Sequence, residues 1–391
     1  MKIVSAIATE PDADQAADHL LDEVRPDLAG ERPDLAVLFV SGHPQEALAR
    51  AAGRVRSTLG AATLVGCTGQ GVIGGDLEVE RKPALSLLAA RFPGARVHPF
   101  RMVCRQEGDE FVYDGWPDPG EIRDPRAFLL FVDPFSNVPE IVLSGLAARF
   151  GPVPIAGGMS SGGTSPGANF LFLDDRAYRF GLAGVALAGD LAVRTVVSQG
   201  CRPIGRHFVV TEAKENVIYK IGGKPALAKF EEIYRELPHP EQELARRALH
   251  VGRVMNEYQE TFQRGDFLIR NCEGFDSESG AIVISDRVRV GQTLQFHVRD
   301  RAAASEDLHA LLRAEGAGKG VAGGLLFTCN GRGRRLFGVP SHDARAVREE
   351  LGKLPLAGFF AGGEIGPVAG KAYLHGYTAS LALFAPAART E

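Results

Sequence analysis

Apolar and polar residues follow the same succession three times along this chain. Each copy begins with an apolar run typical of a buried strand and continues with apolar residues at helical spacing. It then reaches a second apolar run that leads into glycines, followed by one or two further strands. The first apolar runs are Ala36–Ser41, Ala127–Phe135 and Gly323–Gly333. The glycine-rich runs are Ala62–Asp76, Val153–Gly163 and Leu354–Pro367. This succession predicts three strand–helix–strand units that share a pattern rather than residue identity.

A region of different character separates the second and third copies. Its pattern predicts strands over residues 202–223, 266–271, 280–288 and 292–300, and helices over residues 225–237, 241–258 and 303–316. We place the main boundary near Gly200–Gly205, which gives two domains, residues 1–203 and 204–391. The expected fold class is α/β or α+β, with two sandwich domains of mixed sheets covered by helices.

Glycine is the one unusual feature of the composition, with 47 residues gathered in clusters along the chain. A buried strand that ends in glycine leaves backbone amides accessible, so a ligand can approach the chain closely there. Three such turns can line one cavity or two. The alternative is that they are only tight turns between strands.

Two glycine motifs match well-known signatures only in form. Gly69–Gly74 fits GxGxxG, but GDLEVERK follows it and predicts a turn and a strand where a dinucleotide site needs a helix. Gly158–Gly162 fits GxSxG, but the glycines and Pro166 that follow do not predict the helix of a nucleophile elbow. The chain contains neither a Walker A sequence nor HExxH. We therefore expect binding rather than catalysis, and no metal site.

Composition narrows the classes of partner. The formal charge is −4 and the sequence pI is about 6.2, which argues against broad binding to nucleic acid or to an anionic membrane. No apolar run is long enough to cross a bilayer. Five cysteines without a CxxC pair, and no leader sequence, indicate reduced thiols and a cytoplasmic location.

The third copy carries the richest chemistry. Cys329, Asn330 and Arg332 follow a buried strand, Glu364 lies between glycines after the next strand, and His375 lies on a later strand. If these strands are neighbours, the side chains converge on a polar pocket in which Arg332 binds a carboxylate or phosphate. The alternative is a structural Arg332–Glu364 ion pair beside a core histidine, with an inert thiol at position 329.

At these residues the sequence resembles the FIST family, bacterial sensory proteins with an N-terminal and a C-terminal FIST domain. The matching segments extend from about Ala36 to Phe384. They are LVGCTGQGVIGG, VPIAGGMSSGG, QRGDFLIRN, SGAIVISDRVRVGQTLQFHVRD, GLLFTCNGRG, LAGFFAGGEIGPV and HGYTASLALF.

The resemblance implies intracellular sensing of a small molecule, an amino acid or similar metabolite among the candidates. Signalling would pass to a partner chain such as a histidine kinase, a diguanylate cyclase or a chemotaxis protein. By motif, the implied ligand-binding residues are Cys329, Asn330, Arg332, Gly333, Gly363, Glu364 and His375.

Two alternatives to this sensor remain open. One is an enzyme with Cys329 as nucleophile and His375 as base. The other is a haem-based gas sensor with His375 as axial ligand, which rests on the family alone.

Overall fold

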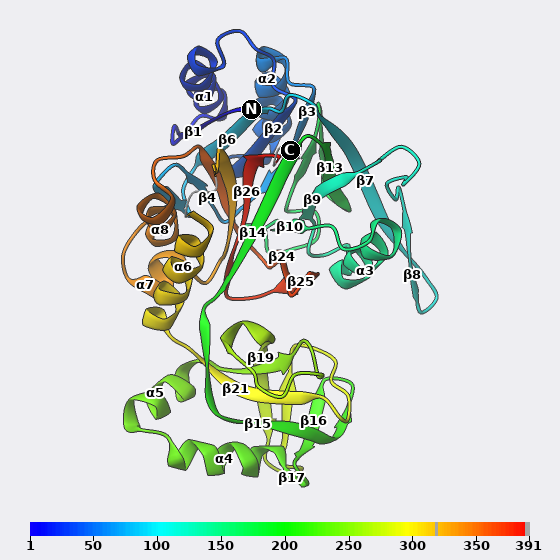
Figure 1. The fold of residues 1–391 in the computed structure, drawn as a ribbon, viewed down its shortest axis with the longest axis vertical. Coiled ribbons are helices and arrows are strands. Elements are labelled where there is room, and N and C mark those ends of the chain that lie inside the picture. Colours follow the sequence, from blue (N-terminus) through cyan, green and yellow to red (C-terminus); the bar gives the residue numbers. More distant parts are fainter. Residues whose placement is uncertain (317–319, 388–391) are drawn as a thin grey trace. The chain divides into compact units, whose positions relative to one another are not determined.

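The computed structural model describes residues 1–316 and 320–387. The chain divides into two compact units (Figure 1). Unit 1 comprises residues 1–197, 309–374 and 378–391, and unit 2 comprises residues 198–308 with 375–377. Unit 2 is therefore an insertion into unit 1. The domain boundary expected between residues 203 and 204 stays a prediction. In the structure the third strand–helix–strand copy belongs to unit 1, because its strands pair with strands of the first two copies.

Unit 1 contains the three expected repeats, each with a parallel strand pair joined through a helix. The first repeat has β1 (Lys2–Ala8), α1 (Ala13–Leu28), β2 (Leu35–Ser41), α2 (Gln45–Leu59), β3 (Thr63–Thr68), β4 (Gly71–Gly74), β5 (Leu77–Glu80) and β6 (Ala84–Arg91). The second has β7 (Ala95–Glu107), β8 (Glu110–Asp114), β9 (Pro125–Val132), α3 (Pro139–Phe150), β10 (Ile155–Met159), β11 (Leu171–Leu173), β12 (Arg176–Tyr178) and β13 (Leu182–Gly189). The third has β14 (Leu191–Gln199), α6 (Arg301–Gly316), β22 (Gly323–Cys329), α7 (Gly333–Phe337), α8 (His342–Leu351), β23 (Leu356–Ala361), β24 (Glu364–Val368), β25 (Lys371–His375) and β26 (Thr378–Pro386).

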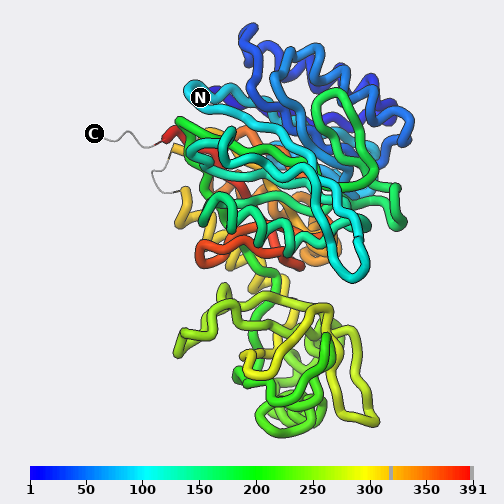
Figure 2. The backbone as a smooth tube through the Cα atoms, turned by 90° about the vertical axis from the view of Figure 1, so that its right-hand side faces the viewer, coloured from blue at the N-terminus to red at the C-terminus, as the bar shows by residue number. Residues whose placement is uncertain are grey.

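The repeats exchange hairpins in a cycle. The sheet orders are β1-β6-β2-β3-β11-β12, β25-β24-β10-β9-β13-β7-β8 and β14-β26-β22-β23-β4-β5. Hairpin β4–β5 of the first repeat thus extends the third sheet, β11–β12 of the second extends the first, and β24–β25 of the third extends the second. Figure 2 traces the backbone in chain order, from blue at the N-terminus to red at the C-terminus. Each sheet is completed by a strand pair from another repeat, so the mixed α/β fold and the repetition predicted from the sequence are confirmed.

A glycine occupies the same place in all three parallel pairs. A Cβ on any of these glycines would lie 1.8–1.9 Å from a leucine carbonyl oxygen of the neighbouring strand, closer than any non-bonded contact allows. The three pairs of glycine and facing leucine are Gly66 with Leu38, Gly157 with Leu130, and Gly358 with Leu326. This close approach explains why each second strand carries glycine at that point.

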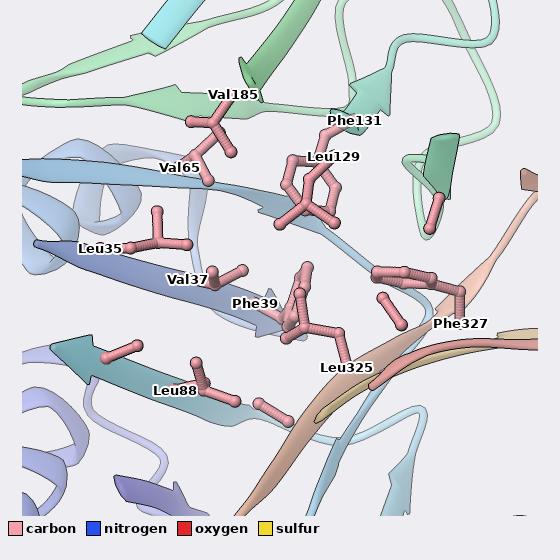
Figure 3. Close-up of a cluster of buried hydrophobic side chains, with 14 of the residues drawn as sticks. Leu35, Val37, Phe39, Val65, Leu88, Leu129, Phe131, Val185, Leu325 and Phe327 are labelled. Atoms are coloured by element: carbon pink, nitrogen blue, oxygen red, sulfur yellow. The ribbon is translucent and has the colours of Figure 1, made fainter. Parts of the chain in front are cut away.

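The residue after each of these leucines is a phenylalanine, and the three rings meet in the core. The ring centroids lie 5.4 Å apart for Phe39 and Phe131, 6.3 Å for Phe39 and Phe327, and 6.1 Å for Phe131 and Phe327 (Figure 3). Phe359 stacks on Phe39 at 4.9 Å. Edge-to-face and offset contacts between rings at these distances stabilise a fold beyond the apolar area that they bury. The cluster therefore holds the three repeats together where β2, β9 and β22 meet.

Unit 2 is a closed antiparallel barrel. Its elements are β15 (Cys201–Lys214), β16 (Val217–Ile221), β17 (Lys224–Pro225), α4 (Ala226–Glu236), α5 (His239–Ala248), β18 (Leu249–Val254), η1 (Arg264–Asp266), β19 (Phe267–Asp276), β20 (Ala281–Ile284) and β21 (Thr293–Arg299). The strand order is β15-β21-β18-β19-β20-β16-β17, and β15 also pairs with β16, which closes the sheet on itself.

The helix predicted over residues 241–258 is wrong in its second half. α5 ends at Ala248, and the next six residues form β18, which pairs with both β19 and β21. The apolar spacing of LHVGRV fits either element, and the two strand partners decide the outcome. Gly252 also serves the strand, because a Cβ there would lie 2.3 Å from Cε1 of His297.

Two further findings complete the fold. The sequence pattern did not predict β1 or α1, although α1 carries an N-cap, Asp12, whose carboxylate accepts hydrogen bonds from the backbone N–H groups of Asp14 and Gln15. Among the helices of the described residues, none is both long and apolar enough to cross a membrane.

Candidate functional site

The glycine turns of the three repeats come together at the carboxyl ends of β2, β3, β10, β22 and β23. The Ser161 hydroxyl is the link: it accepts a hydrogen bond from the Gln70 N–H at 2.8 Å, and it lies 3.4 Å from Oδ1 of Asn330 and within hydrogen-bond distance of the Phe360 carbonyl. These residues belong to the first, second and third repeats, so a group bound beside Ser161 would contact the junction of all three.

A cavity of about 450 Å³ opens at this junction. We call it the strand-end cavity; the residues that line it are Val40, Ser41, Gly42, His43, Gln45, Leu48, Thr68, Gly69, Gln70, Arg81, Ser161, Gly162, Gly163 and Ala168. They come from the first repeat and from the turn that follows β10. Its position beyond the carboxyl ends of two parallel strands is typical of ligand sites in α/β proteins.

Arg332 lies away from this cavity, in a buried polar cluster of the third repeat. It is 0% exposed, and its Nε and Nη2 donate to the two carboxylate oxygens of Asp343 at 2.7 and 2.9 Å. The Thr328 hydroxyl donates to the same carboxylate at 2.6 Å. The alternative of an ion pair for Arg332 is thus realised, with Asp343 as the partner in place of the expected Glu364.

The electrostatics of the cluster follow from its burial. Burial alone would raise the pKa of Asp343, but the Arg332 charge and the hydrogen bonds to His342 and Arg332 outweigh it and lower that pKa. Burial likewise opposes the charge of Arg332, but Asp343 raises the Arg332 pKa above its ordinary value. The pair is therefore fully ionised inside the protein.

Glu78 also belongs to the cluster, and it comes from hairpin β4–β5 of the first repeat, which pairs with the third sheet. Its Oε1 accepts hydrogen bonds from the backbone N–H groups of Asp343 and Ala344, at 2.8 and 2.9 Å, in the first turn of α8. Burial and the neighbouring Asp343 carboxylate raise the pKa of Glu78 to about 8. Glu80, two residues on, accepts from the Arg334 N–H at 3.0 Å in α7. Two carboxyl groups of the first repeat thus dock at two helix starts of the third.

The structure places the seven predicted residues in three settings. Asn330 reaches Ser161 at the edge of the strand-end cavity. Arg332 lies in the buried cluster, where Cys329 and Glu364 are near enough to favour its charge, and Gly333 and Gly363 are the chain neighbours of Arg332 and Glu364. His375 belongs to unit 2. A ligand-binding role for these residues stays a prediction.

The backbone and side chains of the cluster are engaged in the fold. The Glu364 carboxylate accepts from the N–H and hydroxyl of Thr378, at 3.1 and 2.7 Å. The Gly363 carbonyl accepts from the Met159 N–H at 2.8 Å. Gly333 has φ +58°, and a Cβ there would lie 2.8 Å from the Glu80 carboxyl group. The half-buried Cys329 adds its charge, when ionised, to those that favour the Arg332 cation.

Sequence reasoning missed Asp343, Glu78 and Arg81. Asp343 carries a local signal, an acidic residue in the first turn of the predicted helix after the Arg332 turn. Glu78 and Arg81 carry none, because they reach their places through the exchange of hairpin β4–β5 and the turn that follows it.

Comparison with known proteins gives the family. Residues 34–224 match the FIST N domain and residues 226–367 match the FIST C domain. An uncharacterized protein of Mycobacterium tuberculosis is 43% identical over 388 residues, which cover 98% of this chain and 100% of the relative. An uncharacterized protein of Mycobacterium bovis is 40% identical over 387 residues, covering 98% and 99%. FIST domains are associated with sensory signal transduction and small-ligand binding. The chain belongs to the FIST family.

Proposed function

We propose that this protein is a sensory protein that binds a small molecule in the strand-end cavity and passes the signal to a partner protein. The observation that carries the proposal is the cavity itself, of about 450 Å³ between glycine turns of two repeats. That volume suits a metabolite, since ligand pockets range from roughly 300 to 1,000 Å³. An amino acid or a similar metabolite fits this size.

The hydrogen bonds around Ser161 offer a route for the signal. A ligand in the cavity touches Ser161 and Gln70, and through Ser161 it acts on Asn330 of the third repeat. Most of unit 2 lies, along the chain, between β14 and α6 of that same repeat. Binding that favours one arrangement of these turns would shift the population of conformers that a partner recognises. We propose a cytoplasmic partner of the histidine kinase, diguanylate cyclase or chemotaxis type.

Native mass spectrometry of the freshly purified protein, compared with the denatured mass, tests whether a small molecule is bound. We expect an added mass that is lost on denaturation. Ala168→Phe would fill the cavity, because Ala168 is half-buried in its wall. Ala62→Phe is the matched control, an exposed alanine just before β3 at the opposite end of that strand.

The two variants separate binding from folding. Loss of the added mass in Ala168→Phe, with an unchanged melting temperature and retention in Ala62→Phe, would support the proposal. A ligand that remains bound to folded Ala168→Phe would place its site elsewhere and contradict it.

A further inference from the structure

We infer that the strand-end cavity binds an anion, with a carboxylate or phosphate group of the ligand facing Arg81. The inference rests on the proposed function, which places the ligand in this cavity, and it adds the chemical class. Five observations carry it: the charge of the lining, a second arginine at the edge, the helix start at the wall, the buried His43, and the glycine turn at Gly42.

The lining carries one charged side chain. Arg81 is exposed, and among the residues that the structure describes it forms no ion pair. Nor does any acidic side chain of the described residues line the cavity. A guanidinium with no competing carboxylate is suited to two parallel hydrogen bonds with a carboxylate or phosphate.

A second cation stands at the edge. The Arg179 guanidinium donates to Oε1 of Gln45 at 3.1 Å, and Gln45 is a lining residue. Arg179 is also fixed by the Gly167 carbonyl at 2.7 Å and lies 4.5 Å from the Phe170 ring centroid. Its positive charge is therefore held near the cavity, where it raises the local concentration of anions.

The wall includes the start of α2. This helix begins at Gln45, its N-cap is Pro44, and no side chain caps the first backbone N–H groups. Uncapped N–H groups and the helix dipole favour a negative group at this end.

His43 is an independent observation that points to a ligand acceptor at this wall. The residue is 9% exposed and lines the cavity. The Pro11 backbone lies near the ring, but neither ring nitrogen has a hydrogen-bond partner of good geometry among the described residues. Burial lowers the pKa of His43, more than the Pro11 backbone and the Asp12 and Glu10 carboxylates raise it. The ring is therefore neutral, with one N–H to donate. A buried donor that lacks a well-placed acceptor is unfavourable, so an acceptor oxygen of a ligand here would be stabilising.

The glycine turns let the backbone form this wall. Gly42 has φ +65°, and a Cβ there would lie 2.6 Å from the Pro83 nitrogen. A side chain at this position would displace the turn that carries Arg81. Gly42 thus allows Arg81 and the start of α2 to line the same cavity.

Isothermal titration calorimetry at low salt with three probes tests the inference: succinate, inorganic phosphate and the neutral analogue succinamide. We expect succinate or phosphate to bind and succinamide to bind at least about tenfold more weakly, since a charge-assisted hydrogen bond is lost. The stronger of the two anions tells a carboxylate site from a phosphate site. Arg81→Gln should weaken anion binding about tenfold or more, whereas Arg81→Lys should retain part of it.

Arg176→Gln is the matched control, because it removes the same charge from an exposed arginine of β12 outside the cavity. Equal affinity for succinate and succinamide, equal effects of Arg81→Gln and Arg176→Gln, or no binding of either anion would overturn the inference. If the added mass seen in native mass spectrometry survives in Arg81→Gln but is lost in Ala168→Phe, the proposed function stands and only the ligand class is wrong. If Ala168→Phe leaves that mass bound, the proposed function itself fails.

Discussion

Two arginines of unit 1 belong to glycine-rich strand-end regions, and their surroundings give them opposite roles. Arg332 is fully buried and bound at two nitrogens by Asp343. Arg81 is exposed on the wall of the strand-end cavity, without an acidic partner among the described residues. A buried guanidinium keeps its charge and needs a carboxylate partner to offset its loss of hydration, and once paired it contributes to the fold. An exposed one keeps its hydrogen-bonding capacity for a ligand.

Neither the residue type nor the surrounding motif decides which of the two arginines can bind a ligand. The conspicuous motif TCNGRG contains Arg332, which is paired with Asp343, whereas the less conspicuous segment ERKP contains Arg81, which has no acidic partner among the described residues. The presence of an acidic partner decides it. For Arg332 that partner is Asp343, which lies at the start of α8, eleven residues further along the chain.

Arg332→Ala should produce the largest effect. It leaves the Asp343 carboxylate buried without its cation, which costs about 3–5 kcal/mol in the free energy of unfolding. Chemical denaturation followed by circular dichroism measures the loss. A change below about 1 kcal/mol would show that Arg332 is not structural, and the two arginines would then be alike.

Glu78→Gln tests the carboxyl group that caps the helix of Asp343. The Glu78 carboxyl group has a pKa of about 8 in the folded protein, whereas an ordinary glutamate of the unfolded chain has a pKa of 4.5. The free energy of unfolding therefore falls by about 4 kcal/mol as pH rises between these values. The variant should lack this decline.

Urea midpoints of wild type and Glu78→Gln from pH 5 to pH 9 provide the measurement. Asp343 has a lowered pKa and titrates below this range, so it does not obscure the effect. Parallel pH profiles of the two proteins would contradict the assignment of a buried proton to Glu78.

Replacing both partners of the buried pair should restore part of the stability. We expect Arg332→Met combined with Asp343→Leu to be more stable than the sum of the two single changes predicts, with a coupling energy of about 2 kcal/mol. A double-mutant cycle measures this energy. Additive losses would mean that the two side chains act independently.

Arg81→Gln should have the smallest effect on stability, within about 0.5 kcal/mol, because an exposed side chain without an ion partner contributes little to folding. Its effect appears in ligand affinity, as described for succinate and phosphate. A substantial loss of stability in Arg81→Gln would assign the residue a structural role and remove the contrast with Arg332.

Sequence pattern was sufficient for the repeats and for most strands and helices, because buried strands and amphipathic helices leave local periodicities. It failed at LHVGRV, where the same apolar spacing fits a helix and a strand and long-range pairing decides. For the site, the glycine turns were predicted as the place where backbone meets ligand. The pairing of Arg332 could not be predicted in this way. It depends on Asp343, and Asp343 is in turn held by Glu78 of the first repeat, which is far away in the sequence.

The exchange of hairpins also sets the order in which the chain can fold. Hairpin β4–β5 is synthesised early, yet its partner β23 lies beyond more than half of the chain, after residues 198–308 of unit 2. Sheets that depend on such distant pairing fold slowly and expose unpaired edges in the meantime. On the ribosome, the first two repeats must wait with open strand edges until the last emerges, and we expect the FIST N segment produced alone to aggregate.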